Sequence, residues 1–255
     1  MSNPVVAPKH KYKKNFLSQV IFQVTFASGA EITDDAMKTY KTSLGGDYSE
    51  LAIVKQQGII IQNDGSNVKT NVEDNYIWQI DSATKDHTIT VAKDSFAISF
   101  VEYSEFKKHL DVISSAQEKF FKQFSSITHV DRLGLRYVNQ IKLNEQRVDW
   151  TKYLSSSLTD SFNFVDSDKL RRSMHSIVIT EDEETQINLN YGIYNQYFPA
   201  PIVDEEFIID IDAYTPASVD VVDCGRILEK FNKTTAIYFE LCIKDELRTV
   251  MEIIS

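Results

Sequence analysis

Apolar and polar side chains alternate in several segments of the chain, which is the period-two pattern of a half-buried β-strand. In residues 17–26, Val20, Phe22, Val24 and Phe26 all fall on one face. The same pattern predicts further strands over residues 58–62, 75–82 with 88–93, 96–103, 129–143, 173–180, 185–194 and 206–214. Turn-forming residues, such as the run Asn63-Asp64-Gly65-Ser66, separate neighbouring strands, so we expect antiparallel meanders.

Two longer segments carry apolar residues at the spacing of an amphipathic helix. The first covers residues 104–124, with Ser104 as its N-cap and an apolar face made of Phe106, Leu110, Ile113, Phe120 and Phe124. The second begins after a cap at Ser218 and carries Val222, Ile227, Phe231, Ile237 and Leu241. Shorter helices are predicted from Thr33 to the Gly45-Gly46 pair and over residues 148–158.

The order strand, short helix, three strands and long helix occurs twice, with a seam near Ser126. We therefore expect an α+β fold of two similar β-α-β-β-β-α halves, residues 16–126 and 127–255. Each half is an antiparallel sheet packed by one long amphipathic helix. Residues 1–15 are basic and lack apolar periodicity, which predicts a flexible tail. No Pro-, Gly- or Ser-rich linker separates the halves, so we expect them to associate tightly, and whether they share one sheet stays open.

The composition of the chain disfavours several classes of protein. The 255 residues are 42% hydrophobic and carry a net charge of −10, which disfavours binding to duplex DNA. The longest apolar runs are far shorter than a membrane span, and the N-terminus lacks a signal-peptide core, so we expect no membrane association and a cytoplasmic location. Cys224 and Cys242 have no His or Cys at metal-ligand spacing and are expected to be buried thiols.

The most distinctive string runs from Asp131 to Asn139, and the strand pattern puts Arg132 and Arg136 on one face, with Asn139 on the other. Two guanidinium groups on one face can grip a phosphate, a carboxylate or an acidic partner. The alternative is cross-strand pairing with Asp210 and Asp212, which would make the arginines structural, and we favour it.

A second basic group, Arg171, Arg172 and His175, stands at the start of a predicted strand and could form an anion pocket or a solvated turn. The five histidines fall in no zinc motif, and the chain contains no nucleophile elbow, Gly-rich phosphate loop or dinucleotide fingerprint. We therefore expect no metal, no cofactor and no catalytic residues, although the sequence does not settle whether the protein is an enzyme.

Aromatic residues gather in one loop-rich stretch that contains Tyr191, Tyr194, Tyr197 and Phe198 beside Pro199 and Pro201. Such a group is typical of a partner-binding surface, and it is equally typical of the end of a hydrophobic core.

Three parts of the chain resemble a sporadically distributed family of uncharacterised prokaryotic proteins of about this length. They are the strand over residues 16–26, the string over residues 132–139 and the ending over residues 239–248. The resemblance extends over nearly the whole chain and supplies no catalytic residues. Many members are expected to have a histidine near the position of Asn232, so a role that depends on it is in doubt here. The patchy distribution implies carriage on mobile or defence-associated loci.

Two functions follow as hypotheses. The first is a non-enzymatic binding or regulatory protein, an accessory of a phage-defence or toxin-antitoxin type system, that binds another protein or itself. Its contact surfaces would be the Arg132/Arg136 strand face and the aromatic stretch. The alternative is an enzyme or sensor that binds a nucleotide or another phosphate-bearing ligand between the halves, through Arg132, Arg136, Arg171 and His175.

Overall fold

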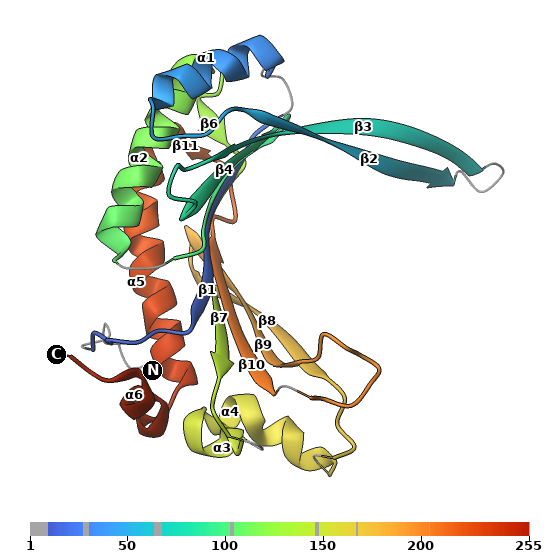
Figure 1. Ribbon diagram of the computed structural model, residues 1–255, viewed down its shortest axis with the longest axis vertical. Helices are drawn as coiled ribbons and strands as arrows, with labels where there is room; N and C mark the ends of the chain where they lie inside the picture. Colours follow the sequence, from blue (N-terminus) through green and yellow to red (C-terminus); the bar gives the residue numbers. More distant parts are fainter. Residues whose placement is uncertain are drawn as a thin grey trace. The chain divides into compact units, whose positions relative to one another are not determined.

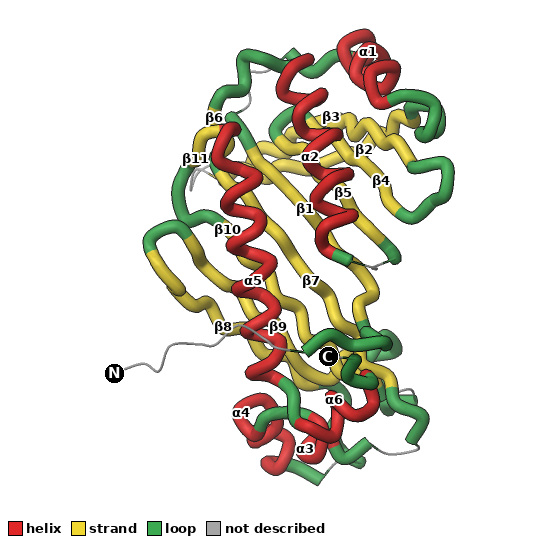
Figure 2. The backbone as a smooth tube through the Cα atoms, turned by 90° about the vertical axis from the view of Figure 1, so that its left-hand side faces the viewer, coloured by secondary structure: helices red, strands yellow, loops and turns green. Residues whose placement is uncertain are grey.

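The structure is a computed structural model that describes residues 10–27, 31–63, 68–102, 105–145, 148–166, 168–203 and 205–254, with the backbone alone given for residues 56–63, 68–75 and 163 (Figures 1 and 2). It is an α+β fold with a large antiparallel sheet, which confirms the predicted fold class. The chain divides into two compact units. Unit 1 comprises residues 1–20, 134–216 and 226–255, and unit 2 comprises residues 21–133 and 217–225.

The strands hydrogen-bond in the order β2-β3-β4-β5-β1-β7-β10-β9-β8, and a separate small ladder joins β11 to β6. The strands of unit 2 are the end of β1 (Leu17–Thr25), β2 (Ala52–Asn63), β3 (Val68–Asp81), β4 (His87–Ala92), β5 (Ser95–Phe100), β6 (His129–Val130) and β11 (Val219–Asp220). Those of unit 1 are the start of β1, most of β7 (Arg132–Lys142), β8 (Ser173–Asp182), β9 (Thr185–Tyr194) and β10 (Glu206–Tyr214).

Six α-helices occur in the part of the chain that the structure describes. They are α1 (Asp34–Leu44), α2 (Phe106–Gln123), α3 (Trp150–Tyr153), α4 (Ser156–Thr159), α5 (Cys224–Cys242) and α6 (Asp245–Met251), with the short 3-10 helices η1 (Asp160–Phe164) and η2 (Val221–Asp223). Four strands, not three, lie between α1 and α2. Between α4 and η2 there are three longer strands, β8, β9 and β10, and the two-residue strand β11. The two runs are therefore similar but not equivalent, and internal duplication stays a prediction.

In unit 2 the helices α1 and α2 pack together over an aromatic core. Thr33 caps α1 as expected, since its hydroxyl oxygen accepts the backbone N–H of Ala36 at 3.3 Å, and the helix ends at Gly45, whose φ of +100° suits glycine. The predicted cap Ser104 lies outside the described residues, and α2 begins at Phe106. Phe120 is fully buried, and its ring lies 4.5 Å from that of Phe96 and 5.6 Å from that of Tyr40.

The hairpin of β2 and β3 extends beyond the other strands of unit 2 (Figure 1). Its register runs from Ala52 opposite Gln79 to Asn63 opposite Val68, whereas β3 pairs with β4 only from Trp78 to Asp81. The predicted strands 58–62 and 75–82 are thus parts of one longer ribbon. The predicted turn after Asn63 lies outside the described residues.

In unit 1 the helix α5 crosses one face of β7, β10 and β9 (Figure 2). Ile227, Leu228 and Phe231 are buried on this helix, as are Phe207 and Ile209 on β10. The predicted helical residues Val222 and Leu241 are instead 90% and 57% exposed. The helix begins only at Cys224, directly after η2, and Ser218 does not cap it: the Ser218 hydroxyl donates to the backbone oxygen of Val130.

Both cysteines are free and buried, as predicted, and burial raises the pKa of Cys224 to about 11 and that of Cys242 to about 12. Both therefore stay protonated near neutral pH, which makes them unreactive. Among the described residues, no helix is long and apolar enough to cross a membrane.

Only part of the predicted tail, residues 10–15, lies within the described chain, and it is held against the C-terminal segment of unit 1. The backbone N–H groups of Lys13 and Lys14 donate to the carbonyl oxygens of Glu252 and Met251 at 2.9 and 3.0 Å. The Tyr12 hydroxyl donates to Glu240 Oε1 at 2.5 Å. These contacts order a segment whose sequence predicts no strand or helix.

Replacing Phe120 by alanine should lower the free energy of unfolding of unit 2 by about 3–5 kcal/mol, because the substitution leaves a cavity among packed rings. The chain has two tryptophans, Trp78 in unit 2 and Trp150 in unit 1, so urea unfolding followed by fluorescence in a Trp150→Phe background has its reporter in unit 2. Val222→Ala is the control, since Val222 also belongs to unit 2, is 90% exposed and should change stability by less than about 0.5 kcal/mol. An effect of Phe120→Ala no larger than that of the control would contradict the packing.

Candidate functional site

The strand β7 carries the arginine string, and its side chains alternate between buried and more exposed positions as predicted. Leu133, Leu135 and Tyr137 are buried, whereas Arg136 is exposed on the opposite face. Arg132, at the start of β7, belongs to unit 2, and Arg136 belongs to unit 1. The two arginines therefore lie in different units.

Arg136 forms a bidentate ion pair with Asp210 on the neighbouring strand β10. Its Nε and one terminal nitrogen donate to the two carboxylate oxygens of Asp210, both at 2.7 Å. The Asp210 side chain is only 7% exposed, and Asn190 also donates to it at 3.5 Å. The register places Asp212 directly opposite Arg136 and Asp210 opposite Val138, so the ion pair is diagonal. This geometry is the cross-strand alternative expected from the sequence.

The ion pair occupies the planar fork of Arg136 and raises the pKa of the guanidinium, chiefly through its hydrogen bonds with Asp210. A buried carboxylate needs such a partner, because an uncompensated charge in a low dielectric is costly. The fork is therefore engaged within unit 1.

Asn139 and Asn232 also have structural partners. The buried Asn139 amide donates to the backbone oxygen of Ile209 at 3.2 Å, on the side of the sheet away from Arg136. The hydroxyl of Tyr137 donates to Asn232 Oδ1 at 2.8 Å, which links the arginine string to helix α5. Asn232 thus has a side-chain partner at the position where the resemblance implies a histidine in other proteins.

The second predicted basic group does not converge on one point. Arg171 donates to the carbonyl oxygens of Asp168 and Leu170 at 2.7 and 3.2 Å. His175 stacks on Tyr191 with the ring centroids 5.1 Å apart, and its Nε2 lies 3.1 Å from Ser161 Oγ and 3.0 Å from Ser173 Oγ. Arg172 lies instead over two aromatic rings, those of Tyr194 and Phe198, each at 5.9 Å.

The aromatic stretch divides into a buried and an exposed part. Tyr191 is buried beneath His175, so its assignment to a partner surface is not supported. Tyr194, Tyr197 and Phe198 are 43%, 55% and 56% exposed. We call these three residues and Arg172 the aromatic surface.

A buried asparagine holds the loop that carries the aromatic surface. Asn195 is 5% exposed; its amide nitrogen donates to the backbone oxygens of Arg171 and Ala200 at 3.0 and 2.7 Å, and its Oδ1 accepts the N–H of Tyr197 at 2.9 Å. The loop closes further through a bond from Ala200 N to Tyr197 O at 2.9 Å. Three side-chain hydrogen bonds from one buried residue fix the backbone beneath Tyr197 and Phe198.

A small pocket adjoins the aromatic surface. It is lined by Gln140, Tyr194, Asn195, Gln196, Tyr197 and Glu206. Glu206 accepts hydrogen bonds from Gln140 and from Lys142, the latter at 3.3 Å. The wall of this pocket thus combines a carboxylate with two tyrosine rings.

In unit 2 the structure brings together a series of hydrogen-bonded side chains that the sequence pattern did not indicate. Asp86 Oδ1 lies 2.7 Å from His87 Nδ1, and His87 Nε2 lies 3.1 Å from the hydroxyl of Tyr48. The ring of Phe100 contacts the rings of both His87 and His109. The pKa of His109 is lowered, mainly because the side chain is buried. Because the His87 side chain is only 10% exposed, we assign these hydrogen-bonded side chains a structural role, which is to stabilise the turn between β3 and β4.

The described residues contain no group of three or more His, Cys, Asp or Glu side chains that could hold a metal ion. No protein-family model and no curated protein matches the chain. The resemblance noted from the sequence therefore stays a hypothesis.

Arg136→Ala should lower the free energy of unfolding of unit 1 by about 3 kcal/mol, because it leaves the Asp210 carboxylate buried without its partner. The double variant Arg136→Met/Asp210→Leu should lose much less, since it removes both charges together. Urea unfolding followed through Trp150 in a Trp78→Phe background measures both effects. If Arg136→Ala changed stability by less than about 0.5 kcal/mol, the structural role of Arg136 would be wrong.

The Asp86 carboxylate should make the stability of unit 2 depend on pH in the acid range. Burial by itself would raise the pKa of Asp86, but hydrogen bonds from Ser82, Thr84 and His87 outweigh it and lower the pKa from 3.8 to about 2. A group whose pKa is lower in the folded state stabilises it above pH 3.8, and this contribution is lost as the pH falls toward 2.

Asp86→Asn should therefore flatten the pH dependence of the free energy of unfolding between pH 4 and pH 2, with urea unfolding followed through Trp78. Asp111→Asn, at an exposed position of α2, is the matched control and should leave that dependence as it is in the wild type. Equal slopes for wild type and Asp86→Asn would contradict the hydrogen-bonded role of Asp86.

Proposed function

We propose that the protein is a non-enzymatic binding or regulatory protein whose aromatic surface contacts a partner protein. The observation that carries this proposal is the exposure of Tyr194, Tyr197 and Phe198 on a loop whose backbone is held by the buried Asn195. Core aromatics are normally shielded, and their exposure in a group beside an arginine is typical of interaction sites.

The composition of the aromatic surface suits a binding hot spot. Tyrosine and arginine are enriched in the residues that contribute most to binding energy, and each aromatic ring offers a large contact area with few rotatable bonds. Because Arg172 already lies over two of the rings and Asn195 holds the loop, little conformational entropy remains to be lost on binding.

The resemblance to a sporadically distributed prokaryotic family supports a role as an accessory of a phage-defence or toxin-antitoxin type system. The net charge of −10 favours a protein partner over duplex DNA. The alternative, a sensor for a phosphate-bearing ligand, has less support, because Arg136 is engaged by Asp210 and Arg171 by backbone carbonyl oxygens.

Photo-crosslinking in the native host tests the proposal. A benzophenone amino acid at position 198 should crosslink a specific protein, and the same amino acid at position 164 should not, since Phe164 is 90% exposed but lies outside the aromatic surface. With the purified partner, Phe198→Ala should weaken binding by roughly 10-fold or more, as expected for a hot-spot aromatic. The same crosslinked products from positions 198 and 164 would exclude the aromatic surface as the contact.

A further inference from the structure

The strand β8 is the outer edge of the sheet in unit 1 and pairs with β9 alone. Its register runs from Ser173 opposite Ile193 to Asp182 opposite Thr185, and Figure 2 shows β8 at one margin of the sheet. In an antiparallel ladder, about half of the backbone N–H and C=O groups of an edge strand point away from its only neighbour. β8 therefore presents a row of backbone donors and acceptors along one side.

This edge lacks most of the features that usually prevent further pairing. Natural edge strands are short, or carry lysine, proline or charged side chains that block a second strand. Residues 173–180, by contrast, form a continuous run with no proline and no Lys, Arg, Asp or Glu. A bulge interrupts the register only at the end of this run, between Thr180 and Asp182.

Apolar side chains are exposed on both faces of β8. Ile177, opposite Leu189 on the side of the core residues, is 44% exposed, and Val178, opposite Asn188, is 62% exposed. Exposed β-branched side chains on the two faces of one edge strand would both be covered if another strand paired beside it.

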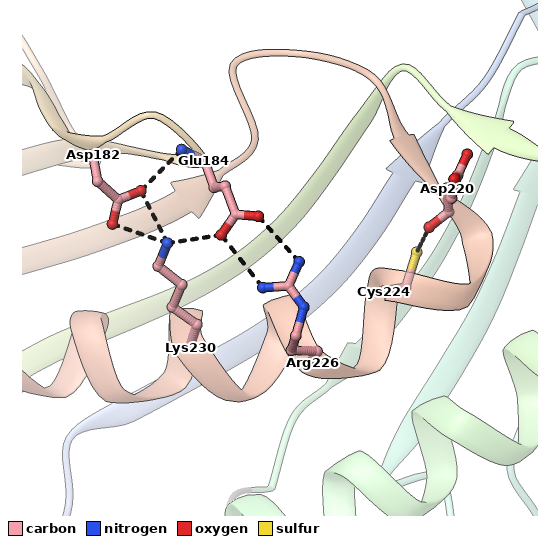
Figure 3. A network of polar contacts seen from close by, with 6 residues as sticks. All are labelled: Asp182, Glu184, Asp220, Cys224, Arg226 and Lys230. Carbon is pink, nitrogen blue, oxygen red and sulfur yellow. Dashed lines mark hydrogen bonds and ion pairs between the residues drawn. The ribbon is translucent and has the colours of Figure 1, made fainter.

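The two ends of β8 carry opposite charge. Arg171 and Arg172 precede the strand, and Glu181 to Glu184 form its acidic end. Part of the acidic end is neutralised within unit 1: Lys230 Nζ lies 2.9 Å from Asp182 and 3.1 Å from Glu184, and Arg226 lies 3.0 Å from Glu184 (Figure 3). Glu181 and Glu183 have no cationic partner among these contacts, so the end stays acidic.

We propose that β8 pairs in antiparallel fashion with β8 of a second copy of this chain, with Ile177 at the two-fold centre. This register keeps the core faces of both copies on the same side and pairs the uncharged residues 174–180 of one copy with those of the other, so that Ser176 lies opposite Val178 and His175 opposite Ile179. It also brings Arg171 and Arg172 of each copy to the acidic end of the other. Parallel pairing would bring like charges together, so the charges select the antiparallel dimer.

Light scattering during size-exclusion chromatography tests the dimer. The wild type should run at twice the monomer mass of 29.2 kDa, and Val178→Lys should run as the monomer, because a lysine on the edge opposes strand addition. Val222→Lys is the matched control, since Val222 is 90% exposed and belongs to η2 of unit 2, not to a strand of unit 1; this variant should remain dimeric. Thermal melting of each variant verifies that it is folded.

A charge-swap experiment tests the antiparallel orientation. Arg172→Glu and Glu183→Lys should each raise the dissociation constant of the dimer by roughly tenfold, because each places like charges at both ends of the homodimer. A mixture of the two variants should form a heterodimer that restores the wild-type constant, and so should the double variant Arg172→Glu/Glu183→Lys.

A wild type that stays monomeric at low salt and high concentration would overturn the proposal, as would a dimer that Val178→Lys leaves intact. Failure of the mixture to associate would overturn the antiparallel orientation. The test is separable from that of the proposed function, because Val178→Lys leaves the aromatic surface unchanged and should still crosslink a partner from position 198.

Discussion

One-sided burial is the constraint on which the rest of the structure depends. Within unit 1, helix α5 covers one face of β7, β10 and β9, and within unit 2 the helices α1 and α2 pack over the aromatic core. Each strand must therefore be apolar on one face and compatible with water on the other. The alternation along β7, with buried Leu135 and Tyr137 on either side of exposed Arg136, is the direct result.

On the face of the sheet that carries Arg136, the buried Asp210 carboxylate needs a partner of opposite charge. Asp210 lies on a central strand, and its neighbours shield it from water, so its carboxylate requires the bidentate Arg136 and the amide of Asn190. The most distinctive string in the sequence thereby gains a structural explanation. What is left for recognition are the parts of unit 1 where apolar groups stay exposed, namely the aromatic surface and the edge strand β8.

Both of these features place side chains in solvent on a backbone that is already ordered. At the aromatic surface, the order comes from three hydrogen bonds of the buried Asn195. At β8 it comes from pairing with β9 and from the clamp of Lys230 and Arg226 on the acidic hairpin. A preorganised surface loses little entropy on binding, so modest apolar areas can suffice for association.

Residues adjacent in sequence were the ones whose roles the sequence could predict. The strand faces, the cap at Thr33 and the buried cysteines follow from local periodicity. The pairing of an arginine with Asp210, 74 residues away, is an exception, which was expected because both residues stand on predicted strands whose faces carry charge. Tyr191 was grouped with the partner surface because other aromatic residues follow it closely in the sequence, yet it is buried beneath His175. The hydrogen bonds that join Asp86, His87 and Tyr48 were missed, because Tyr48 and His87 are 39 residues apart in the sequence.

By itself, the sequence determined which segments are strands or helices and which of their faces are apolar, because both depend on the spacing of neighbouring side chains. Only the tertiary structure decided that β7 lies beside β10, that β8 is an edge, and that Arg171, Arg172 and His175 do not converge. Strand pairing is made by backbone hydrogen bonds that are the same for every residue. The order of strands is therefore set by how the whole chain buries its apolar faces, and no local pattern contains it.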